Sequence, residues 1–238
     1  MDNVLQITGL TKCYGNAAMP ALKELTVSLP AGKIVGLLGT NGSGKTTLMK
    51  LIAGLLTANA GQILVCGKPV GPETKMLVSY LPDRTYLSNA QRIREQLDFF
   101  QDFYTDFDRR RAEEMLANLD ISLDAKFGTL SKGNREKVQL VLVMSRRAKL
   151  YLLDEPIGGV DPAARDYILR TIVNNYDPEA TVIISTHLIA DVEQVLDEYL
   201  FIHQGGLVQA GTVDAVRESS GKSLDEVFRE VFRCFPSY

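Results

Sequence analysis

A glycine-rich segment constrains the fold of this chain more than any other feature of the sequence. Residues 39–46 read GTNGSGKT, which matches the phosphate-loop spacing G-x-x-x-x-G-K-[ST]. The preceding residues 34–38 (IVGLL) form a short apolar run that is typical of a buried parallel strand. A helix is predicted to follow through residues 47–53 and to stop near Gly54. A strand, a phosphate loop and a helix in this order predict an α/β fold with a P-loop NTPase core.

The residue types in this loop suit the binding of a nucleoside triphosphate. Glycines allow the backbone to curl so that successive N–H groups point at phosphate oxygens, and the following helix presents its positive N-terminal end to the same anion. Lys45 is a flexible point charge that can reach the β- and γ-phosphates, and Thr46 offers a hydroxyl to Mg²⁺. We therefore expect ATP and Mg²⁺ as cofactors, with contacts from Gly39, Asn41, Gly42, Ser43, Gly44, Lys45, Thr46 and Thr47.

Two acidic residues follow a second apolar run. Residues 150–156 read LYLLDEP, and Mg²⁺ at a phosphate loop requires a buried strand that delivers a carboxylate to its C-terminal end. We expect Asp154 on the metal side, acting through water, and Glu155 beside the water that attacks the γ-phosphate. An ordinary helix cap or loop would also explain such a pair, but the presence of Lys45 in the same chain favours the catalytic reading.

A third apolar run also ends in polar residues. Residues 181–187 read TVIISTH, which places His187 at the end of a predicted strand, where it can contact the γ-phosphate. A lone histidine more often has a structural or surface role. We assign that role to His203, which has no comparable context.

The remaining pattern predicts a single domain, residues 1–238, whose α/β core carries a helical insert at about 84–148. The sequence from about residue 88 to 147 is polar and helical, and a helix that starts with proline is predicted at 162–174. Further strands are predicted at 4–10, 22–29, 62–65, 77–81, 151–153, 181–185, 200–202 and 207–209.

The tail predicts an amphipathic C-terminal helix at about 223–233. Ser223 and Glu226 have the spacing of a capping box. We favour a helix that packs on the core, and contact with another subunit is the alternative. The apolar residues on its single face are Leu224, Val227, Phe228, Val231 and Phe232.

The charge and the cysteines exclude several kinds of partner and site. The formal net charge is −3, so no nucleic-acid partner is expected. Three scattered cysteines, Cys13, Cys66 and Cys234, give neither zinc spacing nor a disulfide framework and fit a cytosolic protein. The N-terminus lacks the pattern of a signal peptide, and no apolar run approaches the roughly 18 residues of a membrane-spanning helix. We therefore expect any membrane role to depend on a partner chain.

The motifs stand in an order that resembles the ATP-binding subunit of an ABC transporter. The resemblance runs from about Val4 to the tail and is far more specific than the phosphate loop alone. It rests on the phosphate loop, residues 130–134 (LSKGN) at the place of the family's signature loop, residues 150–156, residues 160–162 (VDP) and His187. The resemblance implies a P-loop NTPase core of the ABC ATPase type, with an antiparallel β subdomain and an inserted α-helical subdomain.

The resemblance also implies a mechanism. Two ATPase chains would face each other head to tail around two ATP molecules, and Ser131 and Gly133 would touch the γ-phosphate bound to the partner chain. Glu155 matches the catalytic base, His187 the switch histidine, and Asp161 the loop that couples the two sites. The insert would receive a helix from an integral membrane subunit, which would hold the chain at the cytoplasmic, inner face of the cell membrane.

Tyr14 matches the aromatic residue that stacks on adenine in this family. An aromatic side chain beside Gly15 could instead cover the edge of a sheet.

Two positions depart from the family pattern. The signature has Lys132 and Asn134 where the family has glycine and glutamine. Lys132 would either attract phosphate or, as we slightly favour, point to solvent, and Asn134 can still cap the helix that follows. Asp83 stands where the family has a glutamine that reports on Mg²⁺ and the attacking water, and we expect Asp83 to reach either one with a shorter arm.

The insert carries a run of arginines at residues 109–111, flanked by Asp106, Asp108, Glu113 and Glu114. A solvated charged helix face is the favoured interpretation, and contact with a membrane subunit or lipid head groups is the alternative.

The leading functional hypothesis is the ATPase subunit of a membrane transporter, most like bacterial export-type systems. A non-transport ABC ATPase acting on a cytosolic complex is the alternative, although the chain has neither two ATPase units nor long coiled coils. A nucleotide-binding regulator without turnover is disfavoured because Glu155 and His187 are both present. The sequence does not define the substrate, the direction of transport or the membrane partner. It also does not define whether the chain forms a homodimer or a heterodimer.

Overall fold

A four-stranded antiparallel sheet forms one part of the molecule. The computed structural model describes residues 3–15 and 19–233. Within them this sheet has the order β2-β1-β4-β5, and its register shifts at three places between β1 and β2. The strands are β1 (Asn3–Lys12), β2 (Leu22–Pro30), β4 (Ala60–Val65) and β5 (Lys68–Pro69).

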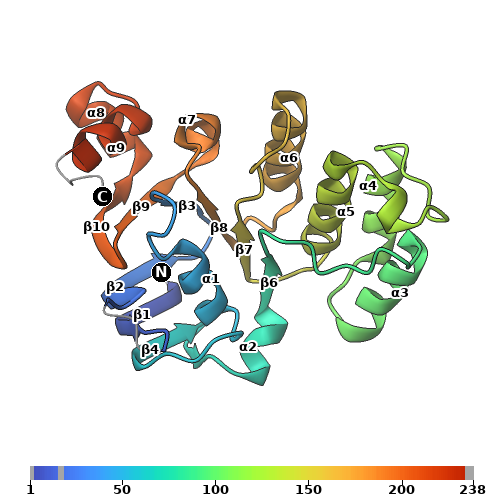
Figure 1. The fold of residues 1–238 in the computed structure, drawn as a ribbon, viewed down its shortest axis with the longest axis horizontal. Helices are drawn as coiled ribbons and strands as arrows, with labels where there is room; N and C mark the ends of the chain where they lie inside the picture. Colours follow the sequence, from blue (N-terminus) through green and yellow to red (C-terminus); the bar gives the residue numbers. More distant parts are fainter. Residues whose placement is uncertain (1–2, 16–18, 234–238) are drawn as a thin grey trace.

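A six-stranded sheet forms the centre (Figure 1). Its order is β10-β9-β3-β8-β7-β6, and every neighbouring pair is parallel except β10 with β9. The strands are β3 (Ile34–Leu38), β6 (Val78–Leu81), β7 (Leu150–Asp154), β8 (Thr181–Thr186), β9 (Glu198–His203) and β10 (Gly206–Thr212). The two sheets together confirm the predicted fold class.

Alternate residues of the central strands pack on opposite faces of the sheet, as the period of a strand requires. Val35 and Leu37 of β3 join one apolar cluster with the antiparallel sheet and with α1 (Lys45–Ile52). Ile34 and Leu38 join a second cluster on the other face, with helices from the C-terminal half of the chain. Those helices are α6 (Pro162–Asn175), α7 (Ile189–Val192), α8 (Val213–Ser220) and α9 (Leu224–Arg233).

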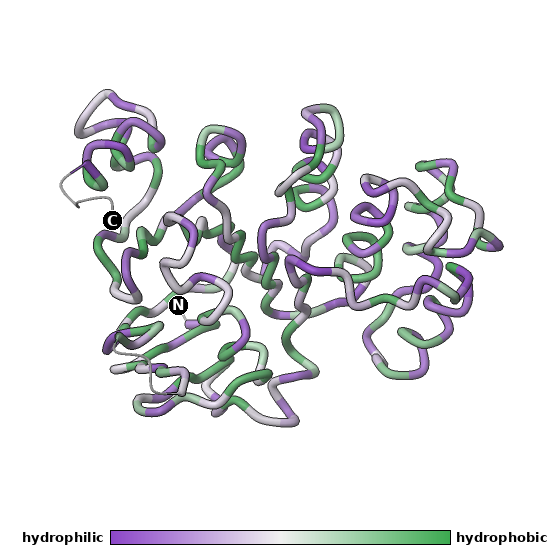
Figure 2. The backbone as a smooth tube through the Cα atoms, in the orientation of Figure 1, coloured by the Kyte–Doolittle hydropathy of each residue, from purple (hydrophilic) through white to green (hydrophobic). Residues whose placement is uncertain are grey.

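The segment between β6 and β7 is helical and has its own apolar cluster. It contains α3 (Ile93–Phe103), α4 (Arg109–Ala117), a short 3-10 helix (Phe127–Thr129) and α5 (Lys132–Met144), whereas α2 (Pro72–Leu77) precedes β6. Hydrophobic and hydrophilic residues alternate along the peripheral helices (Figure 2), which leaves one face of each for packing. No helix in residues 3–15 and 19–233 is both long and apolar enough to cross a membrane.

Arg146 joins this helical insert to the central sheet. Its guanidinium is buried and donates to the carbonyls of Met76 and Val78, at 2.8 and 2.7 Å. It also bonds both carboxylate oxygens of Asp106 at 3.2 Å and stacks 3.8 Å from the centroid of the Tyr104 ring. The insert is thereby fixed to the chain that enters β6.

The arginine run at residues 109–111 is only partly a solvated face. Arg110 is exposed and pairs with Glu114, as expected for such a face. Arg109 is held between Asp98 and Glu113, and Arg111 donates to the side-chain oxygen of Asn175 at the end of α6. The prediction is wrong for Arg111, because the end of α6 supplies its guanidinium with a protein acceptor.

The C-terminal helix α9 packs on the central sheet. Phe228 and Phe232 lie 5.2 and 6.1 Å from the ring of Phe201 in β9, and Leu224 is fully buried. The Ser223 and Glu226 pair forms reciprocal hydrogen bonds at the start of the helix. Cys13 and Cys66 are free thiols, and Cys234 lies outside the described residues.

Candidate active site

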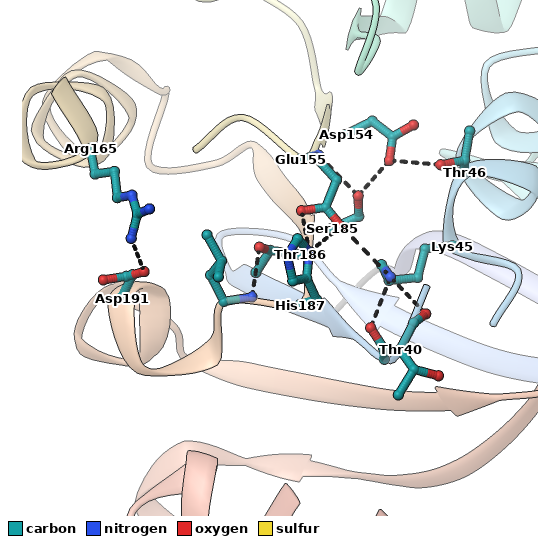
Figure 3. A network of polar contacts seen from close by, with 12 residues as sticks. Thr40, Lys45, Thr46, Asp154, Glu155, Arg165, Ser185, Thr186, His187 and Asp191 are labelled. Atoms are coloured by element: carbon teal, nitrogen blue, oxygen red, sulfur yellow. Dashed lines mark hydrogen bonds and ion pairs between the residues drawn. The ribbon is translucent and has the colours of Figure 1, made fainter. Parts of the chain in front are cut away.

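The carboxyl ends of β3, β7 and β8 bring the predicted chemistry to one edge of the central sheet. Residues 39–44 follow β3, Asp154 ends β7, Glu155 comes directly after it, and His187 follows β8 (Figure 3). A cleft of about 250 Å³ opens beside them and is lined by residues 41–47, Ala21, Asp83 and Glu155. In parallel sheets, ligands bind at this edge.

Glycine is required where the loop meets the first helix. Gly44 has a φ of 108°, and a Cβ there would lie 2.6 Å from the carbonyl oxygen of Ala21. A Cβ on Gly39 would lie 2.3 Å from the carbonyl oxygen of Ile202. No side chain caps α1, so its first N–H groups are available to an anion in the cleft.

Lys45 is the buried cation of the cleft. Its ammonium donates to the carbonyl oxygens of Gly39 at 2.9 Å and Thr40 at 3.1 Å, and lies 3.7 Å from Glu155 Oε1. Burial lowers the pKa of Lys45, whereas attraction to Glu155 and Asp154 opposes that shift. A phosphate anion in the cleft would offset the same burial cost, which fits the predicted role of Lys45.

Asp154 is buried and surrounded by hydroxyl donors. Its Oδ1 accepts from Ser185 at 2.5 Å and from Thr46 at 3.2 Å, and its Oδ2 accepts from Tyr80 at 3.4 Å. Burial raises the pKa of Asp154, although the hydrogen bonds from Ser185 and Thr46 oppose the rise. A neighbouring cation would therefore favour the charged carboxylate.

The donors beside Asp154 fit a magnesium ion held largely by phosphate. Within the described part of the chain, no three His, Cys, Asp or Glu side chains gather into a metal cluster. Magnesium at phosphate sites uses one or two protein groups, several waters and the phosphates themselves. The Thr46 hydroxyl and the Asp154 carboxylate, 3.2 Å apart, supply such a pair.

Glu155 and His187 form a polar pair above Lys45. His187 Nδ1 lies 3.1 Å from Glu155 Oε2 and 3.2 Å from Oε1. The Glu155 N–H donates to the Ser185 carbonyl at 3.0 Å, and the backbone φ of Glu155 is 50°. A positive φ is uncommon outside glycine and is frequent at functional sites.

The structure brings two further predicted residues to the cleft. Asp83 lines it beside the phosphate loop, as the position after β6 requires. The Tyr14 hydroxyl lies 3.3 Å from Thr47 Oγ1, and its half-exposed ring is 5.5 Å from the Lys12 ammonium. An aromatic face is therefore open beside the start of α1.

The signature residues lie apart from this cleft. Neither Ser131 nor Gly133 is among the described residues that line it. Ser131 Oγ accepts from the N–H of Asn134 at 3.3 Å, so Ser131 caps α5 and the expectation that Asn134 caps it is wrong. The helix begins at Lys132, which places Asn134 inside the first turn.

Lys132 and Asp161 bond within the chain. The Lys132 ammonium is largely exposed and donates to the Gly159 carbonyl at 3.1 Å, so it does more than point to solvent. Asp161 Oδ1 accepts from the Ala164 N–H at 3.0 Å and caps α6.

Two hydrogen-bond donors to Asp154 were not predicted from the sequence. Ser185 and Tyr80 were assigned only to strands, and their hydroxyls contact Asp154 because β8 and β6 both neighbour β7. The polar end of the run at 181–187 was the available signal for Ser185. No sequence signal marked Tyr80.

Comparisons with known proteins find related sequences. The family described as ABC transporter matches residues 22–158, more than half of the chain. An uncharacterized ABC transporter ATP-binding protein of Synechocystis is 30% identical over 227 residues, which are 90% of this chain and 64% of that protein. The SkfA peptide export ATP-binding protein SkfE of Bacillus subtilis is 31% identical over 212 residues, 87% of this chain and 88% of that protein.

A solved structure has the same fold. It is an ATP-binding subunit of an ABC transporter, with a TM-score of 0.85 and 30% identity, and the match covers 96% of this chain and 99% of that one.

Proposed function

The chain belongs to the ABC transporter family, whose ATP-binding subunits hydrolyse ATP, and on this premise we propose that it powers a membrane exporter by ATP-driven closure of a dimer. The observation that carries the proposal is the position of Glu155, 3.7 Å from the Lys45 ammonium and 3.1 Å from His187. A base, a phosphate-binding cation and a polar partner for the base are thus present together.

Each side chain has a distinct task in hydrolysis. Lys45 and the N–H groups at the start of α1 bind the phosphates. Thr46 and Asp154 would hold Mg²⁺, and the ion would supply positive charge beside the phosphates. Glu155 accepts the proton of the attacking water at its carboxylate. His187 Nδ1 orients that carboxylate, and the half-exposed ring would contact the γ-phosphate of bound ATP.

A second ATPase chain completes the site. Ser131 and Gly133 begin α5 and line no part of their own chain's cleft among the described residues. We assign them to the γ-phosphate held by the partner chain, where the N-terminus of a 13-residue helix favours an anion. ATP then joins the two chains, and its hydrolysis separates them.

An aromatic groove beside the helical insert is our proposed dock for the membrane subunit. The groove has a volume of about 560 Å³ and lies between α1, β6 and α3. Its walls include Phe103, Phe99 and Leu55, which are 65%, 52% and 58% exposed. Large exposed apolar side chains gathered at one groove mark an interaction site.

The rim of the groove is positively charged, which favours an occupant with negative charge. Lys50, Lys75 and Arg84 line it and form no ion pair within the described residues, and no Asp or Glu belongs to the lining. We propose an amphipathic helix of the membrane subunit that inserts apolar side chains between Phe99 and Phe103 and presents a carboxylate to this rim. Docking there would hold the chain at the inner face of the membrane.

Phe103→Asp tests the groove. When the purified chain is used to capture proteins from detergent-solubilised membranes of the native cell, the variant should recover at least about tenfold less integral membrane protein than wild type. The reason is that a charge replaces an exposed aromatic side chain of the binding groove. ATP affinity should stay unchanged. Val173→Asp, at an apolar position on α6 that is 40% exposed and outside the groove, is the control and should recover wild-type amounts. Equal recovery by Phe103→Asp, or recovery of a cytosolic complex by wild type, would contradict the proposal.

Asp83→Ala tests the residue that departs from the family pattern. Because Asp83 lines the cleft but lies apart from Lys45's own hydrogen bonds, the variant should lose ATP hydrolysis and retain ATP binding. Phosphate release and equilibrium nucleotide binding measure the two effects separately. Unchanged turnover would remove Asp83 from the reaction.

A further inference from the structure

The segments that follow β7 and β8 contact each other at two places, one beside the cleft and one farther from it. The segment after β7 carries Glu155 and continues into α6, and the segment after β8 carries His187 and continues into α7. The first connection is the contact of Glu155 with His187. The second is an ion pair between Arg165 of α6 and Asp191 of α7, with Nη1 2.8 Å from Oδ2 (Figure 3).

Arg165 also holds the loop that precedes its helix. Its Nε donates to the carbonyl of Val160 at 3.2 Å, next to Asp161. One planar guanidinium therefore bonds the loop after Glu155 and the helix after His187 at the same time. The side chains of Arg165 and Asp191 are 27% and 38% exposed, so the pair is only partly solvated. A lysine could reach the carboxylate but lacks the second, fixed donor.

The helix on the far side of this link is short, and its tertiary contacts include the buried side chains of Ile189 and Val192. α7 has four residues, Ile189–Val192, and a single helical turn is marginal without tertiary contacts. Asp191 lies four residues after His187, which itself precedes the helix. The ion pair adds a polar link between α6 and α7 to this apolar packing.

We propose that Arg165 is a positioning residue for ATP hydrolysis, which keeps His187 and Glu155 within hydrogen-bond distance by tying their two segments together. This inference rests on the proposed roles of Glu155 and His187. Arg165 lines no part of the nucleotide cleft, so its loss acts on the catalytic step and leaves the phosphate contacts of Lys45 intact. A displacement of about 1 Å at such a pair can lower a rate by about 100-fold.

Arg165→Gln and Asp191→Asn test the link from both sides. Each should lower kcat for ATP hydrolysis by about tenfold or more, with the KM for ATP within about twofold of wild type. Arg165→Lys, which keeps the charge opposite Asp191 but loses the fork to Val160, should lie between wild type and Arg165→Gln. A structural role alone would lower thermal stability without this separation of kcat from KM.

Arg217→Gln is the matched control. Arg217 forms a similar ion pair with Glu193 at 3.3 Å and lines one surface depression together with Arg165 and Asp191. It has no hydrogen bond to the loop at 156–161. It should keep the wild-type kcat. An unchanged kcat in Arg165→Gln and Asp191→Asn, or an equal loss in Arg217→Gln, would overturn the inference.

Glu155→Gln separates this inference from the proposed function. If Glu155→Gln loses turnover while Arg165→Gln keeps it, the positioning role alone is wrong. If Glu155→Gln keeps wild-type turnover, Glu155 is not the base, and both proposals fail together.

Discussion

Glu155→Gln is expected to lower ATP turnover by about 10²–10⁴-fold while the affinity for ATP stays within about twofold of wild type. Glutamine has the same shape but cannot accept a proton from the attacking water. The hydrogen bonds that hold the Lys45 ammonium at Gly39 and Thr40 do not involve Glu155, so Lys45 should stay in place to bind phosphate. Phosphate release and equilibrium binding of ATP measure the two quantities.

The same variant should accumulate an ATP-bound dimer, because closure precedes hydrolysis in the proposed cycle. Light scattering with ATP and Mg²⁺ would detect it, and ADP should not produce it. Glu198→Gln, a half-buried glutamate in β9 away from the cleft, is the control and should turn over ATP like wild type. If wild type binds ATP but neither dimerises nor turns over, a different chain completes the site.

The central sheet could be predicted because its strands carry strong local signals. The runs at 34–38, 150–154 and 181–186 are mostly apolar and are buried along their whole length, as expected for strands that are covered on both faces of a sheet. The short helices α2 and α8 were not predicted, because their local sequence signals are weak. α2 and α8 have only six and eight residues, too few for a helical period to stand out, and α8 depends on its Thr212 cap.

The candidate site was predictable to the extent that function fixes residue types. Glycines and a lysine at the phosphate-loop spacing, after one apolar strand, and two acids after another predict the binding and hydrolysis of a nucleoside triphosphate. The contacts of Ser185 and Tyr80 with Asp154 depend on strand order, which puts β8 and β6 on either side of β7. Strand order arises from packing across the whole chain, and no local pattern encodes it.

The hydrogen bonds between distant elements also could not be predicted from the sequence. Arg146 lies in a polar stretch that predicts a surface position, yet it is buried and bonds two separate segments, at residues 76–78 and at Asp106. Lys132 replaces a glycine and bonds the Gly159 carbonyl because α5 begins beside the loop after Glu155. Long cationic side chains find partners that only the folded chain supplies.

Lys45→Met should have the largest effect on nucleotide binding and little effect on the stability of the free protein. Loss of a charged hydrogen-bond donor to phosphate costs about 1.5–3 kcal/mol, which weakens ATP binding by about 10–100-fold. In the free protein, methionine removes the burial cost that lowers the pKa of Lys45, and this gain offsets the two lost hydrogen bonds. The unfolding free energy without ATP should therefore change by only about 1 kcal/mol.

Stabilisation by ATP separates these two effects in one experiment. At an ATP concentration of about 100 times the wild-type Kd, bound nucleotide stabilises the wild type by about 2.7 kcal/mol, and a 100-fold loss of affinity leaves only about 0.4 kcal/mol. Thermal unfolding with and without ATP and Mg²⁺ measures the difference. Lys50→Met, the same substitution in the last turn of the same helix and outside the cleft, should keep the full ATP-induced shift. A wild-type shift in Lys45→Met would mean that the loop backbone and the helix N-terminus alone hold the phosphates, and that Lys45 acts only after ATP has bound.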